Sequence, residues 1–219
     1  MTTRLRRDAG IARRMRYSDG DGDLAVRIAR EAAEAHVGGR AMRPFVVPPP
    51  FEERAGAFVT LLVYPSGELR GCIGYPEPFF PLLKSVVKGA EGATEDPRFP
   101  ALTPQELDLV TVEVSLLTPP QLIEARKPKE ISKHIRIGED GLIVAQGAFR
   151  GLLLPQVAVE WKWDAETFLS GTCGKAGLHP DAWLDESTRV KKFQAEIFAE
   201  TEPRGAVTRR HLGAEHARR

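Results

Sequence analysis

Residues 58–75 have the sequence FVTLLVYPSGELRGCIGY, in which two apolar runs flank a short segment of turn-forming residues. The first run, 58–64, is rich in β-branched and aromatic residues, which favour β-strands. Residues 65–68 contain the Pro, Ser and Gly that are typical of turns, and 69–75 form the returning run. The sequence therefore predicts a β-hairpin over residues 58–75.

Helical segments are expected on both sides of this hairpin in the sequence. Asp23 has the position of an N-cap, and Gly38-Gly39 closes the helix that follows it. Pro81 begins a second helix, Thr103-Pro104 begins a short one, and Asp164 caps a later one.

Further strands are expected over residues 110–116, 142–145 and 152–154. A late strand is expected where Phe193, Ala195 and Ile197 alternate with polar residues, as in a half-buried strand. Strands joined in pairs by short turns indicate the α+β class, with a largely antiparallel sheet and flanking helices, rather than a parallel Rossmann fold. A late strand that pairs with an early one would make the first part of the domain discontinuous in sequence.

The composition is that of an ordinary globular protein, with 42% hydrophobic and 28% charged residues. No apolar run approaches the roughly 18 residues of a membrane span, and we find no signal peptide. Cys72 and Cys173 are the two cysteines, too few for a disulfide scaffold, although one bridge between them stays open. We therefore expect a cytoplasmic protein with reduced thiols and no membrane role.

Positive charge is concentrated at the two ends of the chain. Residues 1–17 carry a net +5 and residues 201–219 a net +3, so residues 18–200 carry −7 of the whole chain's +1. We expect both ends to be disordered and a single domain to span 18–200. Basic tails on an acidic body are not the footprint of a nucleic-acid-binding domain, although they add weak, salt-sensitive affinity for RNA or DNA.

The low content of Asn and Gln indicates a thermophilic source organism. The chain has no Asn, five Gln and 17 Pro, a pattern typical of thermophilic proteins. The excess of Arg (22) over Lys (9) fits a thermophile or a GC-rich genome equally well. No His pair has metal-ligand spacing, and the Gly171–Lys175 segment lacks the spacing of a phosphate loop, so neither a metal nor a cofactor is expected.

Cys72 is the first candidate for chemistry. Gly71 and Gly74 flank it, and glycine inside a strand usually marks a bulge or the close approach of a ligand or backbone. Arg70 could bind a carboxylate or phosphate and could lower the pKa of the thiol, which is reactive as the thiolate. The alternative is a small buried residue in a glycine-rich bulge.

Five ordered blocks of the sequence resemble one known family. They are LRGCIG at 69–74, DPRFP at 96–100, EVSLLTPP at 113–120, GLLLPQVA at 151–158 and the segment from Cys173 to Trp183. On these blocks, which extend over roughly residues 24–200, the chain resembles the AMMECR-type family, named for the human AMME-syndrome critical-region protein. Many members continue the first block with Thr, whereas this chain has Tyr75.

The resemblance implies an architecture and a setting rather than a reaction. Similar proteins have two subdomains of unequal size with a cleft between them near the first block. Prokaryotic relatives are often encoded near, or fused to, a Memo-like protein and a radical-SAM protein. These are the expected partners, and RNA or a small metabolite is the expected substrate of such a system. The oligomeric state is not indicated.

Two hypotheses follow for the cleft. In the first, the protein is an enzyme in which Cys72 is a nucleophile or redox thiol, Asp96 or Glu113 a base, and Cys173 a resolving thiol. The residues expected to bind substrate are Arg70, Gly71, Gly74, Arg98, Gln156 and Lys175.

In the second hypothesis, the protein is a non-catalytic binding or adaptor module that docks a partner protein or peptide. Asp96 and Arg98 are then an ion pair that holds a loop, and the glycines allow backbones to approach closely. Apart from both hypotheses, the simplest explanation of Lys175 is a favourable contact with the dipole of a helix C-terminus, and we expect Trp161 and Trp163 to be packing residues rather than a stacking platform.

Overall fold

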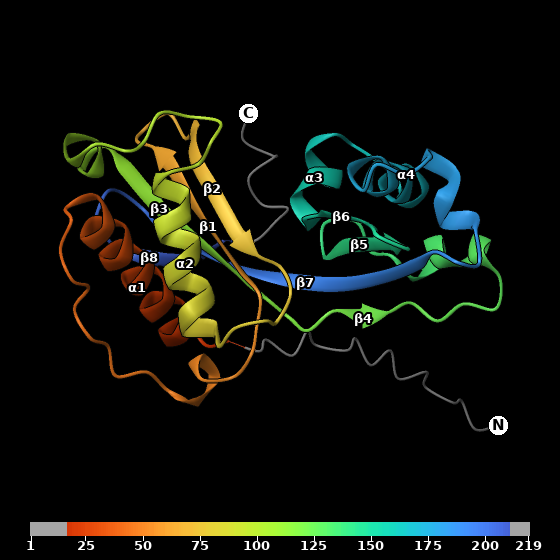
Figure 1. The fold of residues 1–219 in the computed structure, drawn as a ribbon, viewed down its shortest axis with the longest axis horizontal. Helices are drawn as coiled ribbons and strands as arrows, with labels where there is room; N and C mark the ends of the chain where they lie inside the picture. The colour runs from red at the N-terminus through yellow and green to blue at the C-terminus, as the bar shows by residue number, and fades with distance from the viewer. Residues whose placement is uncertain (1–16, 211–219) are drawn as a thin grey trace, which may run out of the picture.

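The computed structural model describes residues 17–210, so the expectations for 1–16 and 211–219 lie outside the described residues (Figure 1). The strands are β1 (Ala57–Val63), β2 (Leu69–Tyr75), β3 (Val110–Leu117), β4 (Gln121–Leu122), β5 (Asp140–Gln146), β6 (Phe149–Leu153), β7 (Arg189–Glu200) and β8 (Val207–Arg210). The helices are α1 (Asp19–Val37), α2 (Leu82–Thr94), α3 (Pro155–Glu160) and α4 (Ala165–Lys175), with the 3₁₀ helices η1 (Pro49–Phe51), η2 (Pro104–Asp108), η3 (Pro128–His134) and η4 (Pro180–Leu184).

The strands form one antiparallel sheet in the order β2-β1-β3-β7-β5-β6, and β4 and β8 also pair with β7. Helices α1 and α2 lie side by side on one face of the β1–β3 half, while α3 and α4 accompany β5 and β6 (Figure 1). This confirms the predicted α+β class, and the hairpin of β1 and β2 lies where the sequence placed it. Within residues 17–210 no helix is long and apolar enough to cross a membrane.

Helix α1 begins earlier than its sequence predicted. Ser18, not Asp23, is the N-cap, because the Ser18 hydroxyl accepts a hydrogen bond from the Asp21 backbone N–H (3.1 Å). The Asp21 carboxylate in turn accepts one from the Ser18 N–H (2.8 Å), which completes a capping box. Asp23 therefore lies inside the first turns, and Gly38 ends the helix as predicted.

Strand β7 connects the two halves of the sheet. Its N-terminal part pairs with β5 and its C-terminal part pairs with β3, so the late strand does pair with an early one. The prediction of a half-buried strand is wrong for residues 195–200, all of which are buried. Glu196 and Glu200 tolerate burial because each forms an ion pair, with Arg209 and Arg30 respectively.

The disorder predicted for the ends is wrong where the structure describes them. Tyr17 is buried at 1% exposure, and residues 207–210 form β8. Strand β8 is held by its pairing with β7 and by the Arg209 guanidinium, which lies 2.5 Å from the Glu196 carboxylate. The boundaries of the expected subdomains stay a prediction.

The second half of the sheet has its own buried cluster. Leu142 and Val144 of β5 pack with Phe168, Leu169 and Cys173 of α4. Helix α4 begins as predicted, since the Asp164 side chain accepts a hydrogen bond from the Thr167 N–H (2.8 Å).

The expectation that both tryptophans pack is correct for only one of them. The Trp163 ring occupies the space beside Gly171, where a Cβ atom would lie 2.5 Å from it. Trp161 is 68% exposed, and its ring lies against that of Trp163 with the centroids 6.1 Å apart.

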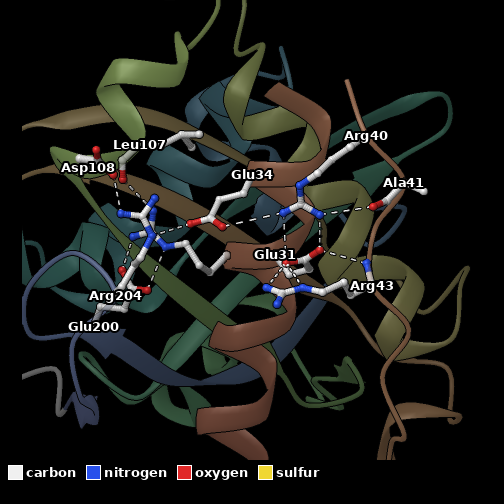
Figure 2. Close-up of polar contacts among 10 residues, drawn as sticks. Glu31, Glu34, Arg40, Ala41, Arg43, Leu107, Asp108, Glu200 and Arg204 are labelled. Atoms are coloured by element: carbon white, nitrogen blue, oxygen red, sulfur yellow. Dashed lines mark hydrogen bonds and ion pairs between the residues drawn. The ribbon is translucent and has the colours of Figure 1, made fainter. Parts of the chain in front are cut away.

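A buried carboxylate on α1 fastens the following loop. Both Glu31 oxygens accept hydrogen bonds from Arg40 and Arg43, including 2.9 Å from the Arg43 backbone N–H (Figure 2). These donors hold the pKa of Glu31 well below its usual range, although burial acts in the opposite direction. One turn further along α1, Glu34 binds Arg204 in the β7–β8 turn, and Arg204 also binds Asp108 (Figure 2). Helix α1 is thus tied to the loop that follows it and to the distant β7–β8 turn, which in turn binds Asp108 of η2.

We expect Glu31→Gln to lower the free energy of unfolding by about 1–3 kcal/mol, because the amide loses charge-assisted acceptors at a buried position. Urea denaturation at pH 7 would show this as a lower midpoint with an unchanged m-value. Glu139→Gln is the matched control, since the Glu139–Arg136 pair is exposed and 3.5 Å apart, and its effect should stay within about 0.5 kcal/mol. Equal losses of unfolding free energy in the two variants would contradict a stabilising role for the buried Glu31 carboxylate.

Candidate functional site

Cys72 lies on the face of the sheet opposite α1 and α2. Strand β2 is an edge strand, and in the sheet register Cys72 is opposite Thr60, which is opposite Glu113 of β3. Directly opposed residues point to the same side of a sheet, so these three side chains form one row. We call this row, Cys72–Thr60–Glu113, the Cys72 face. The Thr60 hydroxyl lies 3.3 Å from the Cys72 sulfur, and the Glu113 carboxylate is paired with Arg210 at 2.9 Å.

Asp96 caps the outer edge of β2. Its carboxylate is buried and accepts a hydrogen bond from the Cys72 backbone N–H (2.8 Å). Arg98 binds both Asp96 oxygens, at 3.0 and 2.6 Å, and its Nη2 also lies 3.4 Å from the Cys72 carbonyl. The pair therefore occupies donor and acceptor positions that an incoming strand would use. The Arg98 guanidinium holds the pKa of Asp96 well below its usual range, so Asp96 is a weak base.

Arg70 is bound elsewhere. The β1–β2 register shifts between Leu61 and Leu62, which leaves Arg70 in the bulge that the glycine pattern predicted. The Arg70 side chain forms a two-point ion pair with Glu106, with Nε and Nη2 at 2.8 and 3.1 Å from the two carboxylate oxygens. This pairing lowers the pKa of Glu106 to about 2.

The prediction that Arg70 activates the Cys72 thiol is therefore not supported. Burial is the largest influence on this group and raises the pKa of the Cys72 thiol above its ordinary value. The Thr60 hydroxyl and the Arg98 charge act against this effect, while the charges of Asp96 and Glu113 add to it. A thiol with a raised pKa is protonated at neutral pH and is a poor nucleophile.

The two motif glycines make room for protein atoms rather than for a ligand. A Cβ on Gly71 would lie 2.1 Å from the carbonyl oxygen of Ala93 at the end of α2. A Cβ on Gly74 would lie 2.3 Å from the ring of Phe58, its cross-strand partner. Close packing, of α2 at Gly71 and of the Phe58 ring at Gly74, thus explains both glycines, and their substrate-binding role stays a prediction.

The remaining candidates do not gather around Cys72. Cys173 is fully buried in the α4 cluster, both cysteines are free thiols, and burial raises the pKa of Cys173, so a resolving role is not supported. Lys175 is an exposed residue in the last turn of α4. Gln156 lies on α3, and its buried side-chain oxygen has no hydrogen-bond partner among the described residues. No group of His, Cys, Asp and Glu within 17–210 is arranged to hold a metal ion.

Several residues of the site were not anticipated. Thr60 and Arg210 reach the Cys72 face only through strand pairing, and Glu106 reaches Arg70 across 36 positions of sequence. The guanidinium groups of Arg70 and Arg98 both lie over the Phe99 ring, 6.0 and 5.6 Å from its centroid. The one available signal was Thr103 followed by Glu106, a capping-box pattern that explains Glu106 as a helix residue but not as the partner of Arg70.

This fold, with its edge-capped β2 strand, matches a known class of α+β proteins. The AMMECR1 family model matches residues 26–198. The chain is 52% identical over 203 residues to a protein of Pyrococcus furiosus, covering 90% of this chain and 96% of the relative. It is 50% identical over 193 residues to a protein of Methanocaldococcus jannaschii, covering 88% and 96%.

A solved relative agrees at the level of structure. The crystal structure of an uncharacterized protein from Pyrococcus horikoshii superposes with a TM-score of 0.81 at 51% identity, covering 87% of this chain and 97% of that one. The chain belongs to the AMMECR1 family. These three relatives come from thermophilic archaea, in agreement with the amide-poor composition.

We expect Asp96→Asn to lower the free energy of unfolding by about 1–3 kcal/mol at pH 7, because the amide cannot accept the charge-assisted bonds of Arg98 and also satisfy the Cys72 N–H. The folded pKa of Asp96 lies below its unfolded value of about 3.9, so this stabilisation is present above that pH and declines as the pH falls further. Denaturation at several pH values should show the two proteins converging in acid.

The control for this variant is Asp164→Asn at the N-cap of α4, where Asn caps about as well as Asp. Its effect should stay within about 0.5 kcal/mol. An Asp96→Asn protein as stable as the parent at pH 7 would show that the edge cap contributes nothing.

We expect Cys72 to be alkylated slowly at pH 7 and faster as the pH rises above the roughly 8.5 of a free thiol, because burial raises its pKa. Peptide mass spectrometry after timed exposure to iodoacetamide measures this rate for each cysteine. Cys173, which is fully buried, is the internal control and should react only on unfolding. Titration of Cys72 well below 8.5 would overturn this assignment.

Proposed function

We propose that this protein is a non-catalytic binding module that docks a partner protein on the Cys72 face. The observation that carries the proposal is the buried Asp96 carboxylate, which is committed to both Arg98 and the Cys72 backbone N–H. A group held in this way fixes the shape of β2 and is a poor proton acceptor.

The other charged groups near Cys72 support the same conclusion. Arg70 is paired with Glu106, and Glu113 is paired with Arg210, so each charge is already balanced by a neighbour in the protein. The thiol itself has a raised pKa. A rigid surface with paired charges suits recognition, since little conformational freedom is lost on binding.

The partner we propose is a protein. The family resemblance makes a Memo-like protein and a radical-SAM protein the first candidates, and the reaction would then belong to the partner. One apolar cluster, centred on Phe193 and Ile197 of β7, is contacted by Phe58 of β1 and by Leu152 of β6. Strand β6 therefore lies on the same side of the sheet as the Cys72 face.

The test is calorimetric titration of the full chain with the purified Memo-like and radical-SAM proteins of the same genome. Thr60→Trp should weaken the affinity for the true partner at least about tenfold, because it fills the centre of the face. Cys72→Ala should weaken the affinity much less than Thr60→Trp, because it only shortens one small side chain of the face. Thr167→Trp, on the exposed side of α4, is the matched control.

Two results would overturn the proposal. One is binding that Thr60→Trp leaves unchanged, which would place the interface elsewhere. The other is a reconstituted activity that Cys72→Ala abolishes while binding is kept, which would make Cys72 a catalytic residue.

A further inference from the structure

The loop after β2 presents an exposed aromatic side chain, Phe79, next in sequence to Phe80, whose ring two lysines cover. Phe79 is 62% exposed, and its neighbour Phe80 packs edge-on against Tyr75 with ring centroids 5.4 Å apart. The ammonium groups of Lys84 and Lys88 lie over the Phe80 ring, at 5.1 and 5.7 Å from its centroid. We call these five residues the Phe79 patch.

The loop that carries Phe79 is firmly held. The Leu82 N–H donates to the Glu53 carbonyl (2.8 Å), and the Ala55 N–H donates to the Phe80 carbonyl (3.3 Å). The Arg54 guanidinium donates to the Phe79 carbonyl at 2.8 Å. Prolines at 76, 78 and 81 further restrict the backbone. Phe79 is therefore pre-organised in its exposed position.

The charge of the patch is positive and available. Lys84 and Lys88 are one helical turn apart on α2, so both ammonium groups lie on one flank of the helix. Among residues 17–210 neither ammonium has a carboxylate partner within ion-pair distance. Glu77, in the same loop as Phe79, is already paired with Arg150. The next acidic residue along α2 is Glu91, about one turn after Lys88. The positive charge of Lys84 and Lys88 contrasts with the net negative charge of residues 18–200.

We propose that the Phe79 patch binds single-stranded nucleic acid. An exposed aromatic ring stacks on a base of any sequence, and neighbouring lysines contact the phosphates on either side of it. This arrangement goes beyond the proposed function, because it uses a different surface from the Cys72 face and needs no protein partner.

The composition of the patch favours a nucleic acid over an acidic protein. A protein interface needs a contiguous apolar centre surrounded by polar residues. Here Phe79 is the single large exposed apolar side chain of the patch, and the ring of Phe80 is covered by the two lysines. An exposed ring that follows a held backbone and adjoins a lysine-covered ring matches one stacked base and its adjoining phosphates.

The test is fluorescence anisotropy of a labelled oligouridylate of about 12 nucleotides, a length within the range of single-strand binders, titrated with the full chain over a series of salt concentrations. Phe79→Ala should weaken binding about 5- to 100-fold with an unchanged salt slope, because a stacking contact is lost. Lys84→Ala/Lys88→Ala should reduce the slope of log K against log salt by about 1.4, since two phosphate contacts are lost.

The control is Lys129→Ala/Lys133→Ala, a pair with the same spacing on η3, which should behave as the parent protein. Circular dichroism confirms that each variant is folded. Binding that none of the Phe79 patch variants changes would overturn the proposal and assign the affinity to the basic ends of the chain. Poly-glutamate binding as tightly as the oligonucleotide would overturn it in favour of an acidic protein partner.

Discussion

The sheet depends on one strand, β7, which pairs with β5 along its first half and with β3 along its second. The C-terminal half of β7 is buried on both faces, since all residues from 195 to 200 are buried. Two of these are glutamates, so the strand needs cationic partners from other segments. Arg30 of α1 and Arg209 of β8 supply them, and the burial of β7 thereby fastens α1 and β8 to the sheet.

Charged side chains from another segment also hold the edge of the sheet at β2. Strand β2 is the first strand of the sheet, and an uncovered edge strand invites pairing with another chain. Asp96 and Arg98 close this edge at Cys72 by bonding its N–H and carbonyl groups. Gly71 allows the end of α2 to approach closely enough to place Asp96 there. The motif residues are thus largely engaged in shaping β2, and this supports the binding role that we propose for the surface.

The charged networks also fit the thermophilic relatives of this chain. Glu31, Glu34 and Arg204 connect α1 to the loop that follows it and to the β7–β8 turn (Figure 2). Networks of this kind stabilise the folded state more strongly at high temperature, because the free-energy cost of removing charged groups from water falls as temperature rises. The Phe79 patch is different, since its lysines have no carboxylate partner among the described residues and are free to meet a phosphate.

The sequence by itself determined the features that depend on neighbouring residues. The β1–β2 hairpin, the Asp164 cap of α4, the end of α1 at Gly38 and the α+β class all follow from local propensity and periodicity. Local rules chose Asp23 over Ser18 as the cap of α1 and treated residues 201–210 as a tail, because neither the capping box nor the pairing of β8 was recognised. The motif blocks identified the family, although they did not indicate what the motif residues do.

Only the tertiary structure decided the partners of the candidate residues. Arg70 is only two positions from Cys72, yet its side chain binds Glu106. Asp96 is 24 positions from Cys72, yet its carboxylate accepts a hydrogen bond from the Cys72 N–H. Burial, which sets the pKa of Cys72, likewise depends on what packs around it. These outcomes depend on distances between segments that are remote in the chain, and periodicity carries no information about such distances.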